Sequence, residues 1–135
     1  MKKLIRIKQL HHVSLVCRDL QRSVVFYRDM IGLEQIERPD FDFEGAWFAL
    51  GAGQLHLIVD EARIPNNPLE PHSRNPHFAI RVEDYNETVK WLKENEIEMI
   101  EKPHSKSGFA QIFCQDPDGY LIELHVPQEE LRKSL

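Results

Sequence analysis

Alternating apolar and polar residues occur in two stretches of the chain whose patterns match. Residues 12–17 (His-Val-Ser-Leu-Val-Cys) and 77–82 (His-Phe-Ala-Ile-Arg-Val) each begin with histidine and then alternate as half-buried strands do. An aspartate follows each stretch, Asp19 and Asp84, and its carboxylate can accept hydrogen bonds from the first turn of a helix. The pattern therefore predicts an internal repeat in which each half opens with a strand and continues into a helix.

Apolar residues at helical spacing predict one helix in each half. The first covers residues 20–31 and ends at Gly32, and the second begins at Tyr85 and loses its pattern by Asn95. Strands with alternating residues follow each helix, so each half is predicted to be a βαβββ unit. The predicted strands are 33–37, 46–50 and 55–59 in the first half and 98–102, 109–115 and 120–126 in the second.

Residues 62–76 hold four prolines and three asparagines, a composition typical of a linker. We therefore predict a single domain over residues 1–135, built from module 10–60, linker 61–75 and module 76–126. The fold class is α+β, with two βαβββ modules. A single module cannot cover both faces of its sheet, so two modules should pair, in one chain or across a dimer.

Composition and charge narrow the class of protein. Hydrophobic residues make up 41% of the chain, which is ordinary for a globular domain. The net charge of −5 and the scattered basic residues argue against nucleic-acid binding. No stretch of 18 apolar residues predicts a membrane span. Two cysteines in a chain of this length favour a reducing compartment, so we predict a cytoplasmic protein.

Strand parity places four side chains of the metal-ligand type at matched positions of the two halves. His12, Ser14 and His77 lie on the strand face opposite the apolar residues that cover the helix. His56 follows His12 by 44 residues and Glu123 follows His77 by 46, on the same kind of face. A lone strand histidine is more often hydrogen-bonded than a ligand. Ligand-type side chains at matched positions of both halves nevertheless favour a metal site. Three imidazoles and one carboxylate suit Zn, Ni, Mn or Fe.

Three segments of the chain form recognisable motifs: Leu-His-His-Val-Ser at 10–14, Asp-Leu-Gln-Arg-Ser at 19–23 and Asp-Pro-Asp-Gly-Tyr-Leu-Ile-Glu-Leu at 116–124. They resemble motifs of the vicinal oxygen chelate superfamily, which includes glyoxalase I, fosfomycin thiol transferases, extradiol dioxygenases and bleomycin-binding proteins. The resemblance covers residues 10–126. It implies a cupped, barrel-like mixed sheet with the helices outside and a homodimer that acts on a small-molecule substrate. It also implies a divalent metal bound by His12, His56, His77 and Glu123, from one chain or from two.

The leading functional hypothesis is a glyoxalase-like lyase or isomerase. The ion would bind two adjacent oxygens of a small substrate and stabilise the enediolate-like charge that develops beside a carbonyl. Glu123, as the only anionic ligand, would carry a proton during the reaction. Arg81, four residues after His77, and Ser14 would orient the substrate.

Two residues of this chain differ from those usual in bacterial glyoxalase I, and both differences weaken the hypothesis of a strict glutathione-adduct lyase. Bacterial glyoxalase I usually has glutamate at the place of His56 and arginine at that of Val16. An extradiol dioxygenase, with His12, His77 and Glu123 as its metal ligands, is therefore kept as an alternative function. So is a fosfomycin-type thiol transferase, whose sequences resemble residues 123–126. The non-enzymatic alternative is a metal-free, antibiotic-binding resistance protein, with one of two aromatic residues, Trp47 or Phe48, lining its cleft.

Overall fold

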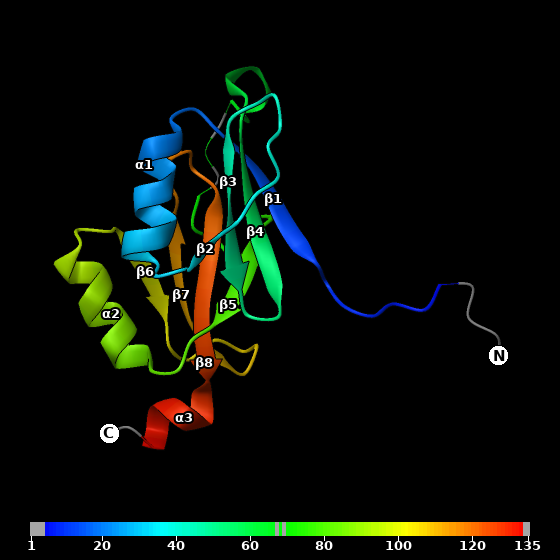
Figure 1. Ribbon diagram of the computed structural model, residues 1–135. Helices are drawn as coiled ribbons and strands as arrows, with labels where there is room; N and C mark the ends of the chain where they lie inside the picture. The colour runs from blue at the N-terminus through cyan, green and yellow to red at the C-terminus, as the bar shows by residue number, and fades with distance from the viewer. Residues whose placement is uncertain (1–4, 67, 69, 134–135) are drawn as a thin grey trace. The chain divides into compact units, whose positions relative to one another are not determined.

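The computed structural model describes residues 5–66, 68 and 70–133 and divides into two compact units (Figure 1). The first unit runs up to Ile64 and the second from Pro65 onward, so the division falls inside the segment predicted as the linker. Residues 1–4, 134 and 135 of the predicted domain, and 67 and 69 of the predicted linker, lie outside the described residues. Each unit contains its own four-stranded sheet.

The first module is built on the strand order β1-β4-β3-β2. Strand β1 runs parallel to β4, whereas β4 with β3 and β3 with β2 are antiparallel pairs. A helical segment between β1 and β2 covers one face of the sheet, where the ring of Tyr27 lies 6.2 Å from that of Phe48. The elements are β1 (His12–Cys17), α1 (Leu20–Val24), the π-helix η1 (Val25–Met30), β2 (Gln35–Ile36), β3 (Gly45–Leu50), β4 (Gly53–Val59) and the 3-10 helix η2 (Glu61–Arg63).

The second module repeats this arrangement with the strand order β5-β8-β7-β6. Strand β5 is parallel to β8, and the other two pairs are antiparallel. Its elements are β5 (Phe78–Arg81), α2 (Tyr85–Glu94), β6 (Met99–Lys102), β7 (Phe109–Gln115), β8 (Leu121–Pro127) and α3 (Gln128–Lys133). The predicted α+β class and the two βαβββ modules are confirmed, as mixed, cupped sheets that are not closed into a barrel. None of the described helices has the length and apolar character needed to cross a membrane.

The helix boundaries follow the sequence signals. The carboxylate of Asp19 accepts a hydrogen bond from the backbone N–H of Arg22 at 3.2 Å, and Asp84 does the same for Glu87 at 2.9 Å. The first helical segment ends before Gly32, whose φ of +88° suits a residue without a Cβ.

The second half of the first helical segment differs from the predicted α-helix. Here the N–H of Ile31 bonds to the carbonyl of Phe26, five residues back, at 2.8 Å. The wider π turn allows two adjacent aromatic residues, Phe26 and Tyr27, to be buried together at 5% and 0% exposure. Apolar spacing alone does not distinguish this π turn from an α turn.

The parity of β3, which the sequence leaves ambiguous, is settled by its contacts. Phe48 is fully buried on the helix-facing side against Tyr27. Trp47 is the register partner of His56 and stacks on its ring, so it lies on the opposite face. The tryptophan therefore shares a face with the predicted ligands of the first module.

Candidate functional site

The register of the two sheets places the predicted ligands at equivalent positions. Ser14 of β1 is the Cα partner of His56 on β4, and Ala79 of β5 is the Cα partner of Glu123 on β8. His56 and Glu123 therefore correspond to each other in the repeat. His12 lies two residues before Ser14, and His77 lies two residues before Ala79. Each module contains two of the four predicted ligands.

In the first module the two histidines form a stack of rings with tryptophan. The ring centroids of His12 and His56 are 4.2 Å apart at 18°, and those of His56 and Trp47 are 3.9 Å apart at 5°. His56 Nε2 donates a hydrogen bond to Gln54 Oε1 at 2.8 Å, and His12 Nδ1 lies 2.9 Å from His11 Nδ1. The ring of His56 is thus fixed by contacts on both faces and at one nitrogen.

The surroundings of His56 favour the neutral form of its imidazole. Burial lowers the pKa of its imidazole, and the positive charge that His12, His11 and Arg38 can carry lowers this pKa further. Metal ions bind the neutral imidazole, so the environment favours the state that a ligand needs.

In the second module a buried carboxylate is the centre of a hydrogen-bonded cluster. Glu123 is only 4% exposed. Its Oε1 accepts a hydrogen bond from Gln111 Nε2 at 3.1 Å, and its Oε2 accepts one from His125 Nδ1 at 2.5 Å. His77 Nε2 also lies 3.1 Å from Oε1. The carboxylate charge is therefore surrounded by nitrogen atoms from three strands or strand ends.

The tautomer of His77 is determined by its other neighbour. His77 Nδ1 donates a hydrogen bond to the backbone carbonyl of Asn75 at 2.7 Å, because a carbonyl oxygen can only accept. In the neutral ring, Nε2 therefore presents a lone pair to Glu123 Oε1. Two acceptors this close together need a cation or a proton between them.

The separation of these two atoms fits two ligands of one divalent ion. Metal–ligand bonds of about 2.0–2.2 Å, set at angles between a right angle and a tetrahedral one, put two ligand atoms about 2.8–3.6 Å apart. His77 Nε2 and Glu123 Oε1 are 3.1 Å apart. A metal-binding imidazole usually donates its other N–H to a carbonyl or carboxylate, as His77 does to Asn75. These donors therefore fit a metal of the predicted kind.

The ligand-type side chains come together in pairs. In the part of the chain that the structure describes, no group of three or more His, Cys, Asp or Glu side chains is arranged to hold a metal ion by itself. The convergence of His12 and His56 with His77 and Glu123, from one chain or from two, stays a prediction.

The two residues predicted to orient a substrate are both exposed. Ser14 lies on β1 beside His56, in the first module. Arg81 lies on β5 beside His125, and its guanidinium carbon is 5.5 Å from the centre of the Phe109 ring. The phenyl ring in turn stacks on His125, with centroids 4.3 Å apart. Arg81 is thus connected through two stacked rings to the cluster around Glu123.

Sequence reasoning missed two hydrogen-bond partners of Glu123. Gln111 and His125 face each other across β7 and β8 and are 5% and 8% exposed. His125 lies two residues after Glu123 on β8, so strand parity places it on the same face, but no histidine matches it in the first half. Gln111 is a polar residue between apolar neighbours in the segment Phe-Ala-Gln-Ile-Phe, and this isolated buried amide is the signal that could have identified it.

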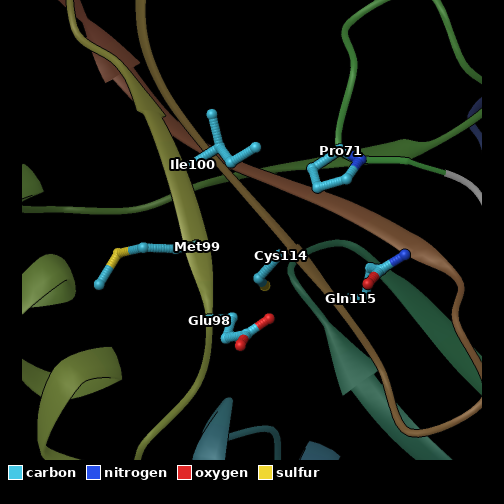
Figure 2. Close-up of a pocket in the computed structure, with 6 residues that line it drawn as sticks. All are labelled: Pro71, Glu98, Met99, Ile100, Cys114 and Gln115. Carbon is cyan, nitrogen blue, oxygen red and sulfur yellow. The ribbon is translucent and has the colours of Figure 1, made fainter.

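One hollow in each module is lined by described residues other than the four predicted ligands. The hollow in the second module has a volume of about 310 Å³. Figure 2 shows the residues that line it: Pro71, Glu98, Met99, Ile100, Cys114 and Gln115. Burial, and to a smaller extent the charge of Asp116, raises the pKa of the Cys114 thiol to about 12. The thiol stays protonated at neutral pH and is therefore a poor nucleophile.

Comparison with known proteins adds the family context. The sequence model of one protein family, the Glyoxalase/Bleomycin resistance protein/Dioxygenase superfamily, matches residues 9–124 of this chain. Glyoxylase I 4 from Arabidopsis thaliana is 33% identical over 127 residues, which cover 89% of this chain and 71% of that protein. Metallothiol transferase FosB from Staphylococcus haemolyticus is 28% identical over 133 residues, covering 95% and 90%. A crystal structure from Bacillus anthracis, described as a glyoxalase family protein, has a TM-score of 0.78 and 25% identity, covering 93% and 99%.

Proposed function

This chain belongs to the Glyoxalase/Bleomycin resistance protein/Dioxygenase superfamily, and we propose that it is a divalent-metal-dependent lyase or isomerase of the glyoxalase type. Its substrate would be a small molecule chelated through two adjacent oxygens. The observation that carries the proposal is that His77 Nε2 lies 3.1 Å from Glu123 Oε1 while His77 Nδ1 donates to the carbonyl of Asn75. The relatives named as glyoxylase and as metallothiol transferase support an enzymatic role.

Four side chains would hold the ion: His12, His56, His77 and Glu123. A bound Zn, Ni, Mn or Fe ion would polarise the chelated oxygens and stabilise negative charge on the substrate. His77 is already oriented for this role by the carbonyl of Asn75, and Glu123 by its two hydrogen-bond donors. The same two modules could supply these side chains within one chain or between two copies in a homodimer.

Glu123 would also carry the proton in an isomerisation. With the substrate bound, the Glu123 carboxylate would leave the ion, accept a proton from the substrate carbon beside the carbonyl and return it to the neighbouring carbon, so that no proton is gained or lost. Arg81 would bind a carboxylate or another anionic group of the substrate, and Ser14 would donate a hydrogen bond to it. Both side chains are exposed and therefore accessible to a ligand.

A thiol transferase is the second candidate function. The relative named metallothiol transferase FosB matches 90% of its own length, a larger share than the 71% of the glyoxylase relative. The same metal ligands would serve this reaction, so only the substrate distinguishes the two candidates.

Purified protein with its metal content determined by mass spectrometry tests the proposal. The metal-loaded protein is assayed with the hemithioacetal of glutathione and a 2-oxoaldehyde, and separately with fosfomycin and a thiol. We expect bound divalent metal and turnover of the hemithioacetal, both lost in Glu123→Gln and kept in the control Glu94→Gln on the exposed end of α2. Thiol addition to fosfomycin alone would favour the transferase. A protein that takes up no divalent metal would contradict both candidates and favour a metal-free binding protein.

A further inference from the structure

The buried carboxylate of Glu123 receives hydrogen bonds from two side chains that the proposed function does not use. We infer that Gln111 and His125 are positioning residues, which hold Glu123 in the one orientation that turns Oε1 toward His77. This inference rests on the proposed metal function, because it explains how the only anionic ligand is prepared for a cation.

The two donors occupy different oxygens of the carboxylate. His125 Nδ1 donates to Oε2 at 2.5 Å and Gln111 Nε2 donates to Oε1 at 3.1 Å. An ionised carboxylate has about four lone-pair directions, so these two bonds leave Oε1 able to bind a further partner. With both oxygens bound, the carboxylate cannot rotate without breaking a buried hydrogen bond. The direction from Oε1 to His77 Nε2 is therefore fixed before any metal binds.

The positions of the donors are themselves rigid. Gln111 and His125 are register partners on β7 and β8, and Glu123 lies two residues before His125 on the same face. The ring of His125 stacks on Phe109 at 13° between ring planes. Neighbouring strands with stacked side chains hold their polar groups more precisely than loops do.

Gln111 has a feature that a purely structural role does not explain. Its Oε1 is buried and has no hydrogen-bond partner among the described residues. Turning the amide over would place Oε1 against the carboxylate of Glu123, where two acceptors repel, so Nε2 must face Glu123. A buried carbonyl without a partner destabilises the fold. The glutamine therefore supplies its contact with Glu123 at the expense of stability.

The test measures metal affinity and stability separately on the full chain. Metal-free wild type, Gln111→Leu and His125→Leu are titrated with Zn²⁺ against a competing chelator, and the thermal unfolding of each metal-free protein is recorded. We expect both variants to bind Zn²⁺ about 10–100-fold more weakly, the effect typical when a hydrogen-bond partner of a metal ligand is removed. The unfolding temperatures show whether each variant is folded, so that a loss of affinity in a folded variant is assigned to the site and not to the fold.

Two further variants identify the hydrogen bond as the cause. His125→Asn keeps an N–H donor near the place of Nδ1 and should restore most of the affinity that His125→Leu loses. Gln115→Leu, on the same strand but opposite Leu121, is the control for replacing a β7 glutamine and should bind Zn²⁺ as wild type does.

The outcomes separate this inference from the proposed function. Glu123→Gln is included in the titration. If it loses Zn²⁺ binding while Gln111→Leu and His125→Leu bind as tightly as wild type, the positioning role is wrong and the metal proposal stands. Failure of His125→Asn to restore affinity also overturns the hydrogen-bond role of His125. If Glu123→Gln itself binds Zn²⁺ like wild type, the proposed function is wrong and this inference is wrong with it.

Discussion

The two modules share one fold but surround their predicted ligands differently. In the first module, the ring of His56 is stacked between those of His12 and Trp47. In the second, His77 faces Glu123, which is buried and hydrogen-bonded to Gln111 and His125.

The comparison shows which features are the same in both halves of the repeat and which differ. Strand order and register are the same in both modules, so equivalent positions point to equivalent faces. The side chains at these positions decide the chemistry. Only the second pair includes an anion, and an anion paired with a neutral imidazole is what attracts a divalent cation. Changes in the second module should therefore affect metal binding more than changes in the first.

Glu123→Gln should have the largest effect. The substitution keeps the shape of the side chain but removes the charge that faces His77. We expect metal affinity to fall by more than the roughly 10–100-fold that loss of a ligand's hydrogen-bond partner causes. Isothermal titration of the metal-free protein with Mn²⁺ or Zn²⁺ measures the effect. Unchanged affinity would mean that the second module is not the dominant half of the site.

His56→Ala should have a smaller effect on metal binding. The lowered pKa of His56 favours a neutral imidazole, which is already hydrogen-bonded to Gln54, so the substitution removes one ligand and no anion. Elemental analysis of the purified variant beside wild type measures the metal retained. We expect reduced metal content, as a four-ligand site requires. Full retention would indicate a site of three ligands, His12, His77 and Glu123.

Trp47→Leu tests the stacked rings of the first module. It removes the ring that stacks on His56 at 3.9 Å and should lower the free energy of unfolding by about 1 kcal/mol through the lost stacking. Urea unfolding of the metal-free protein gives this value. We expect metal affinity to change less than in His56→Ala, and a larger loss would show that the stack orients the ligand.

The smallest expected effect concerns Cys114, a buried group of the second module outside the ligand pair. Below the ordinary thiol pKa of 9.0 the folded and unfolded forms are both protonated, so Cys114 contributes no pH dependence. Above it the unfolded thiol ionises, whereas the folded thiol, with a pKa of about 12, keeps its proton. The free energy of unfolding should therefore fall as the pH rises from about 9, and it should fall less steeply in Cys114→Ala. Urea unfolding at pH 8 and pH 10 gives the free energy of unfolding of both proteins. An equal fall between the two pH values in wild type and in Cys114→Ala would contradict this account.

Much of the fold could be predicted because its signals are local. Alternation located the strands, Asp19 and Asp84 marked the helix starts, and Gly32 marked a helix end. The π turn could not be predicted, because 3.6-residue spacing describes both kinds of turn.

The candidate site was predictable only as a set of positions. Parity put His77 and Glu123 on one face, and the structure brings their side chains together within the second module. The contacts that fix the tautomer of His77 and the orientation of Glu123 involve Asn75, Gln111 and His125. These contacts depend on side-chain rotamers and on hydrogen-bond direction, which no periodic pattern encodes.

The central claim is that the free lone pair of His77 Nε2 receives a divalent cation beside Glu123. Nitrogen NMR of the ¹⁵N-histidine-labelled, metal-free protein, with His77 assigned through His77→Gln, tests it directly when Zn²⁺ is added. We predict that the Nε2 signal of His77 shifts on metal addition, while Nδ1 keeps the proton that it donates to Asn75. A proton on Nε2 in the neutral ring before addition, with no change in either nitrogen afterwards, would contradict the account.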